Sequence, residues 1–171
     1  ENTQYDFKQG IHTLKTGQRN EALLEKIFKT LTAMANAGKG AIGYVLIGVA
    51  DNFEDAEKIR IAYGTESVRV GSFYVTGVNG EVERYYESYD SYLMGIKNAL
   101  DAMPISEHYR RQIGAKMRMV NYHGKAVLIL RITCDNGAAV FDNAYYTRSG
   151  ASNDPEPVSA EAMPAFFMKF I

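Results

Sequence analysis

The stretch 33–51 constrains the fold more than any other part of the chain. It joins the end of a helix-like apolar pattern to a continuous apolar run, residues 44–49, that is too short for another helix and suits a buried strand. Several glycines lie between the two and favour a flexible connection. The stretch therefore predicts a helix-to-strand unit that delivers the carboxylate of Asp51 just past the strand, and Asp51 is the first functional candidate.

The same connection contains a G-x-G-x-x-G pattern, from Gly38 to Gly43. In a dinucleotide-binding fold this pattern follows a strand and opens a helix, so that the helix N-terminus meets the pyrophosphate. Here the helix comes first and the strand second. We therefore interpret the glycines as a connection with Gly38 as the helix C-cap, and we expect no nucleotide cofactor.

The composition predicts one domain, residues 1–171. A chain of 171 residues that is 46% hydrophobic can form one core, and a chain of this size buries roughly 70% of its unfolded surface. Because it opens directly on a candidate motif at Glu1, we expect it to be one domain of a longer protein. With 19 basic and 20 acidic residues, a nucleic-acid partner would have to be held by a local basic patch.

The location predicted from the sequence is the cytoplasm. The single cysteine, Cys134, excludes an internal disulfide and a zinc-type cysteine cluster, and its position after an apolar run predicts a half-buried structural thiol. No apolar run approaches the 18 or so residues that span a bilayer, so no membrane partner is expected.

Hydrophobic periodicity predicts an α+β fold: a mixed, mostly antiparallel sheet of about six strands, with helices packed mainly on one face. Helices are expected at residues 20–35, 53–63, 87–102 and 159–170. Strands are expected at residues 4–8, 44–49, 67–76, 113–122 and 125–132. A turn is expected at Asn79-Gly80, and a shorter hairpin, 138–141 with 144–147, is expected around Asp142-Asn143.

The predicted hairpin of residues 113–122 and 125–132 has one basic side. Alternation places Lys116 and Arg118 on the solvent side, and Lys125 and Arg131 add to it. Such a face can follow a nucleic-acid backbone. The alternative is that these charges keep an exposed strand soluble.

Three motifs occur in order along the chain: Glu1-x4-Asp6-Phe7-Lys8; Ala33-Met34-Ala35-Asn36 followed by residues 43–51; and residues 145–153, Tyr-Tyr-Thr-Arg-Ser-Gly-Ala-Ser-Asn. Together they resemble the Schlafen AlbA-type domain (AlbA_2), and the resemblance spans nearly the whole chain. The family usually has Glu-Phe-Lys where this chain has Asp6-Phe7-Lys8, and a tighter Gly-Gly turn in place of residues 38–43.

The resemblance implies binding of RNA or DNA and, in the Schlafen branch, a metal-dependent endoribonuclease that acts on structured RNA. By motif position its catalytic carboxylates and metal ligands are Glu1, Asp6 and Asp51, and the implied ion is Mg²⁺ or Mn²⁺, which prefers oxygen ligands. Lys8 would neutralise charge on the phosphoryl oxygens. Acidic residues at strand ends are otherwise usually solvated, and this remains the alternative.

A rival function is a non-catalytic module that binds DNA or oligomerises and regulates a larger, divergent ATPase-like protein; homo-oligomerisation is left open. Arg148, in the last motif, is grouped with Lys116, Arg118 and Lys125 as a nucleic-acid contact, because its fork of donors suits a phosphate. Its alternative is an ion pair that pins its own loop. Tyrosines at 85, 86, 89 and 92 either stack on bases or pack in the core.

Overall fold

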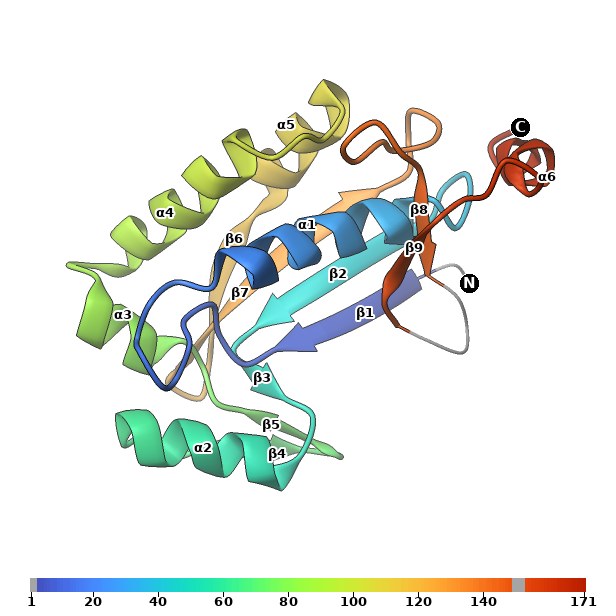
Figure 1. The fold of residues 1–171 in the computed structure, drawn as a ribbon. Coiled ribbons are helices and arrows are strands. Elements are labelled where there is room, and N and C mark those ends of the chain that lie inside the picture. The colour runs from blue at the N-terminus through green and yellow to red at the C-terminus, as the bar shows by residue number, and fades with distance from the viewer. Residues whose placement is uncertain (1–2, 149–152) are drawn as a thin grey trace.

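The computed structural model describes residues 3–148 and 153–171. Its central layer is a four-stranded mixed sheet in the order β1-β2-β7-β6 (Figure 1). The strands are β1 (Thr3–Lys8), β2 (Ile42–Ile47), β7 (Lys125–Thr133) and β6 (Arg118–Tyr122). The pair β1–β2 is parallel and the pairs β2–β7 and β7–β6 are antiparallel. The α+β class with mostly antiparallel strands is confirmed.

Helix α1 (Glu21–Ala35) crosses one face of this sheet, in front of it in Figure 1. The side chain of Asn20 caps it by accepting from the Leu23 N–H over 3.1 Å. Leu24, Ile27, Phe28 and Leu31 recur at helical spacing and are fully buried. The predicted first helix and its buried side are therefore confirmed, and the helix C-cap is Asn36 rather than Gly38.

Helices α3 (Asn79–Tyr85), α4 (Tyr89–Asp101) and α5 (Glu107–Lys116) follow along the chain, and α4 and α5 share the core of α1. The predicted strand 113–122 is wrong in its first part, because residues 113–116 complete α5. Tyr109 and Ile113, one helical turn apart, are both buried against the core, which favours the helix over the alternating strand. The predicted turn at Asn79-Gly80 is also wrong. These residues open α3, and the Asn79 side chain binds the Ala126 N–H.

Two smaller sheets take up the remaining strands, so the strands are divided among three sheets rather than joined in one. At Gly48, whose φ is 111°, the chain leaves the central sheet. It continues into β3 (Val49–Ala50), which joins β5 (Phe73–Val75) and β4 (Val68–Val70) beside α2 (Phe53–Tyr63). The predicted strand 67–76 is thus a hairpin, with its turn at Gly71, whose φ is 59°.

The third sheet is the hairpin of β8 (Tyr146–Arg148) and β9 (Pro155–Pro157), which lies against α1 (Figure 1). The turn at Asp142-Asn143 is confirmed by positive φ values of 48° and 60°. The strand expected at 138–141 is reduced to bridges of Phe141 with Ala144 and Ile105, whereas the strand expected at 144–147 is formed in part, because Tyr146 and Thr147 lie in β8 and pair with β9. The last predicted helix is shorter, α6 (Met163–Met168). No helix in the described part is long and apolar enough to cross a bilayer.

Candidate nucleic-acid interface

The face of the central sheet opposite α1 carries two rows of side chains. Direct partners on neighbouring strands point to the same face. Tyr5, Tyr44 and Arg131 are partners across β1, β2 and β7. The next row, one pleat along, is Phe7, Leu46, Ile129 and Arg118. Both rows therefore run from an aromatic ring at the β1 edge to an arginine on β7 or β6.

A cationic pocket of about 340 Å³ lies at the arginine end of these rows. None of the described residues that line it is acidic; they are Tyr44, Ala115, Lys116, Met117, Arg118, Ile129 and Arg131. Three positive side chains that share a pocket without a carboxylate favour an anionic ligand.

Arg131 is the most confined of the three cations. Its guanidinium carbon lies 5.7 Å from the centre of the Tyr44 ring, a cation–π contact. Its Nε is buried and has no acceptor among the described residues. A buried N–H without a partner is costly, and because this nitrogen is closed to solvent, an anion in the pocket would have to be contacted by the other guanidinium nitrogens of Arg131.

The Tyr5 and Tyr44 rings are stacked, with centroids 5.3 Å apart and planes inclined by 12°. Tyr5 is 55% exposed, and its strand is the edge of the sheet. Arg131 lies over the Tyr44 ring, so the row forms a continuous stack from the edge of the sheet into the cationic pocket.

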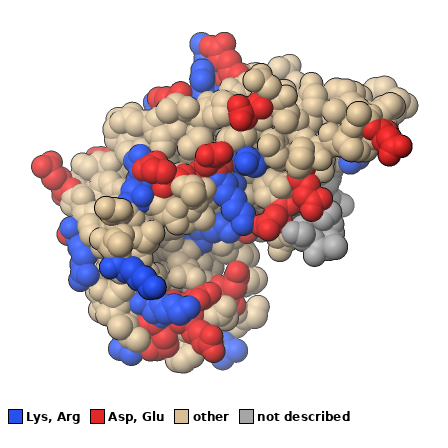
Figure 2. Space-filling view, in the orientation of Figure 1, with Lys and Arg blue, Asp and Glu red and all other residues tan. Residues whose placement is uncertain are grey.

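An apolar groove of about 310 Å³ continues this face toward the second sheet and shares Ile129 with the cationic pocket. Its lining includes Phe7, Leu46 and Phe73, and the Phe7 and Phe73 ring centres are 4.6 Å apart. The face opposite α1, called the uncovered face because no described helix lies over it, thus has a charged half and an apolar half, and the apolar half packs in part against the second sheet. The α1 side differs, because acidic and basic side chains are intermixed on it (Figure 2).

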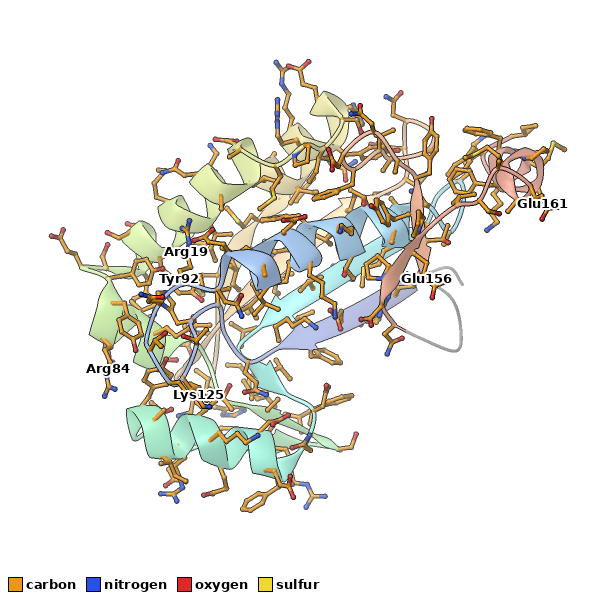
Figure 3. All side chains as sticks on the ribbon, in the orientation of Figure 1. Arg19, Arg84, Tyr92, Lys125, Glu156 and Glu161 are labelled. Carbon is orange, nitrogen blue, oxygen red and sulfur yellow. The ribbon has the colours of Figure 1, made fainter. Side chains whose placement is uncertain are left out.

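The predicted basic residues lie in three places. Lys116 and Arg118 share the pocket with Arg131, although Lys116 belongs to α5 and not to a strand. Lys125 begins β7, at the end of the sheet nearest α2 (Figure 3). It is separated from Arg131 by about 20 Å of strand, at about 3.3 Å per residue.

Arg148 lies on β8 and contacts neutral oxygens. Its Nε donates to the Asn153 carbonyl over 3.1 Å, and its Nη1 donates to Gln4 Oε1 and the Tyr5 carbonyl at 3.5 Å. These contacts join the β8–β9 hairpin to β1. The described contacts of Arg148 are thus with carbonyl and amide oxygens, and the ion pair expected as its alternative is not among them.

The predicted catalytic carboxylates are placed as follows. Asp6 forms an ion pair with Lys8 over 3.1 Å on the α1 side of β1, and the two side chains are 17% and 23% exposed. Asp51 is exposed and directly follows β3. Glu1 lies outside the described residues. Among those described, no group of three or more His, Cys, Asp or Glu side chains is arranged to hold a metal ion.

A second ion pair lies close to Asp6 and Lys8. Lys26 of α1 contacts Asp154 over 2.7 Å, and this contact, with a smaller contribution from Lys8, holds the pKa of Asp154 below its ordinary value. Lys8 is therefore near two carboxylates. A cation bound by Asp6 would have to compete with the Lys8 ammonium, and a site of three carboxylates would need Glu1.

Sequence comparison decides the family. The family described as Schlafen, AlbA_2 matches residues 1–157. The chain belongs to the Schlafen AlbA_2 family. Membership supports a role in nucleic-acid binding. No curated protein matches the chain. The crystal structure of the DIP2311 protein from Corynebacterium diphtheriae is similar, with 15% identity and a TM-score of 0.47, over 90% of this chain and 22% of that chain.

Tyr5 and Tyr44 are not among the site residues that the sequence predicts for this Schlafen AlbA_2 domain, and only the structure makes them candidates. The alternation of Tyr5 and Phe7 with polar residues indicates a shared face, but not that none of the described helices covers this face. The tyrosines that the sequence suggested for base stacking, at 85, 86, 89 and 92, lie elsewhere, and some of them pack in the interior. Tyr92 is fully buried, and Tyr86 packs edge-on against it.

Proposed function

We propose that this Schlafen AlbA_2 domain binds nucleic acid across the uncovered face of its central sheet, with Lys116, Arg118 and Arg131 contacting backbone phosphates. The cationic pocket carries this proposal, because it gathers three positive side chains and no described acidic one. Guanidinium groups bind phosphate oxygens in a fork, and Lys adds a point charge. The chain has a net charge of −1, so attraction to a polyanion must come from a local patch of this kind.

The test is the salt dependence of binding. Arg118→Ala and Lys116→Ala should weaken binding to all sequences alike, and each should lower the slope of log K against log salt by about 0.7–0.9. Lys97→Ala is the matched control, since Lys97 is an exposed cation on α4 outside this face. If the two pocket variants keep the wild-type slope, their charges serve solubility and the proposal fails.

Lys125 and Arg148 stand outside the pocket, and we propose them as contacts at the borders of the bound segment. Lys125→Ala and Arg148→Ala measure how far the contact extends, in the same titration. A lower slope assigns the residue to the interface, and an unchanged slope removes it.

Metal-dependent cleavage of structured RNA is our second candidate function. It is favoured by the short path between Asp6 and Asp51: the carbonyl of Lys8 accepts from the Gly48 N–H over 2.7 Å, and Asp51 follows three residues later. In this proposal Glu1, Asp6 and Asp51 hold Mg²⁺ or Mn²⁺, which supplies Lewis acidity and an activated water. Lys8 neutralises charge on the phosphate.

Asp51→Asn tests this second function. Cleavage of a labelled structured RNA in Mg²⁺ or Mn²⁺ should collapse in Asp51→Asn and in wild type with chelator, while binding persists or tightens because a negative charge is lost. Asp101→Asn is the matched control, as Asp101 is exposed at the end of α4, and thermal melting reports on the fold. If wild type binds RNA but cleaves none in either ion, the regulatory binding module stands instead. Cleavage that is indifferent to Asp51→Asn and chelator also contradicts the proposal.

A further inference from the structure

We infer that the Tyr5–Tyr44 stack is a base-binding platform, so that the nucleic acid recognised by this face is single-stranded. This inference rests on the proposed binding function and names the class of its ligand. The observation behind it is the arrangement of Tyr5, Tyr44 and Arg131, whose aromatic rings and guanidinium group follow one another across three neighbouring strands.

Among the described residues, the partly exposed ring of Tyr5 forms the outer end of the stack. The Tyr5 and Tyr44 rings are nearly parallel, inclined by 12°, and their centroids are separated by 5.3 Å, close to the spacing of the two strands. The two rings therefore project from the same face of the sheet, and the flat side of each ring faces the other ring across the gap between β1 and β2. Tyr44 has the Arg131 guanidinium on its inner side, whereas Tyr5 is on the edge strand and is 55% exposed. A nucleobase that stacks on Tyr5 extends the row.

The charges lie at the far ends of the two rows: Arg131 ends the row of Tyr5, and Arg118 ends the row of Phe7. Arg131 is two strands from Tyr5, about 10 Å away, and Arg118 on β6 is three strands away, at about 4.8 Å per strand. Bases at the β1 edge and phosphates at the β7–β6 side would place the nucleic-acid strand across the sheet. The apolar groove borders this path and is lined by Phe7 and Phe73, so the face can also take the apolar surface of a neighbouring nucleotide.

Whether this face prefers single-stranded or duplex nucleic acid depends on which surfaces of the nucleic acid are accessible to the protein. In a duplex the base faces are stacked on one another, and a protein reaches the backbone and the groove edges. An exposed aromatic ring next to a cationic pocket instead suits unpaired bases, whose faces are free, and aromatic stacking tolerates any sequence. The same residues have a structural role as a cross-strand aromatic pair, so the experiment must separate stacking on a base from stability of the sheet.

The experiment compares three labelled probes by fluorescence anisotropy: a single-stranded RNA, its duplex with the complement, and the same strand with abasic residues. The proteins are wild type, Tyr5→Leu, Tyr5→Phe and Arg118→Ala. Wild type should bind the single strand best. Tyr5→Leu should lower that affinity about tenfold, to the level of the abasic strand, and leave duplex binding unchanged. Tyr5→Phe retains the ring and should bind like wild type, while Arg118→Ala should weaken all three probes.

The outcomes separate the two proposals. If wild type binds none of the probes, both the binding function and the platform fail. If wild type binds but the duplex or the abasic strand is held as tightly as the normal single strand, the platform is overturned and backbone binding stands; this arm needs no variant to fold. An unchanged single-strand affinity in a Tyr5→Leu protein with a wild-type melting temperature also overturns the platform.

Discussion

Tyr92 donates its hydroxyl to Glu81 Oε1 over 2.8 Å, and the two side chains are 0% and 3% exposed (Figure 3 shows Tyr92). The Glu81 carboxylate also accepts from the backbone N–H groups of Ile11, at 3.0 Å, and His12, at 2.7 Å. A buried carboxylate from α3 therefore holds the segment that follows β1. Burial raises the pKa of Glu81, because the charged form loses water, although the hydrogen bonds oppose this shift.

We expect the stability that Glu81 contributes to decline with rising pH. Its folded-state pKa lies above the ordinary value of 4.5, so between the two values the folded protein binds more protons than the unfolded chain. The contribution is complete below pH 4.5 and is lost as the pH rises through the folded pKa. Urea unfolding from pH 4 to 8 should show the free-energy difference between wild type and Glu81→Gln falling across this window. A difference independent of pH contradicts the prediction.

Glu81→Gln should also be less stable than wild type at every pH in that range, by about 1–3 kcal/mol, because its amide N–H would meet a backbone N–H that the carboxylate now accepts. Glu83→Gln is the control. Glu83 is exposed on the same helix, and its replacement should change stability by less than about 0.5 kcal/mol.

Asn36 connects the end of α1 to a distant loop. It is fully buried, donates to the carbonyls of Ala139 and Tyr146 at 2.9 Å, and accepts from the Ala139 N–H at 2.7 Å. Asn36→Ala should cost roughly 3 kcal/mol, because two buried backbone groups of Ala139 and the half-buried carbonyl of Tyr146 lose their partner. Chemical denaturation measures the cost, with the exposed Asn98→Ala on α4 as control. If the two variants lose the same free energy of unfolding, the buried hydrogen bonds of Asn36 do not contribute the stability predicted here.

Gly43 and Gly95 should respond to alanine in opposite directions. A Cβ at Gly43 would lie 2.5 Å from Cβ of the buried Met34, so Gly43→Ala should destabilise the α1–β2 contact by about 1–3 kcal/mol. A Cβ at Gly95, inside α4, would have ordinary contacts at 3.7 and 3.8 Å. Gly95→Ala should raise stability by about 0.5–1 kcal/mol, because glycine is a poor helix former. Thermal melting distinguishes the signs, and a destabilised Gly95→Ala would refute the packing argument.

Cys134 should be unreactive in the folded protein. It is 3% exposed, deeper than the half-buried thiol predicted from the sequence, and burial raises the pKa of the thiol. An aromatic disulfide reagent should modify it only as fast as the protein unfolds, and completely in denaturant. Full modification of the native protein within minutes would be inconsistent with this position.

Local patterns in the sequence determined much of the scaffold. The spacing of Leu24, Ile27 and Phe28 predicted α1, because a helix buries one side at that period. The apolar run 44–49 predicted the β2 region, and Asp142-Asn143 predicted a turn with positive φ. The order of the three sequence motifs indicated the Schlafen AlbA_2 family, and the match to that family over residues 1–157 confirms it. Each of these depends on neighbours a few residues apart.

Tertiary structure decided the rest of the scaffold and the candidate interface. Residues 113–116 alternate like a strand but complete α5, because the core buries Tyr109 and Ile113 together. The partners of Asn36 lie 103 and 110 residues away. Alternation shows that Tyr5 and Phe7 share a face, whereas strand register sets Tyr5 beside Tyr44 and Tyr44 beside Arg131. Which face remains uncovered depends on where the helices pack, and packing is a contact between distant parts of the chain.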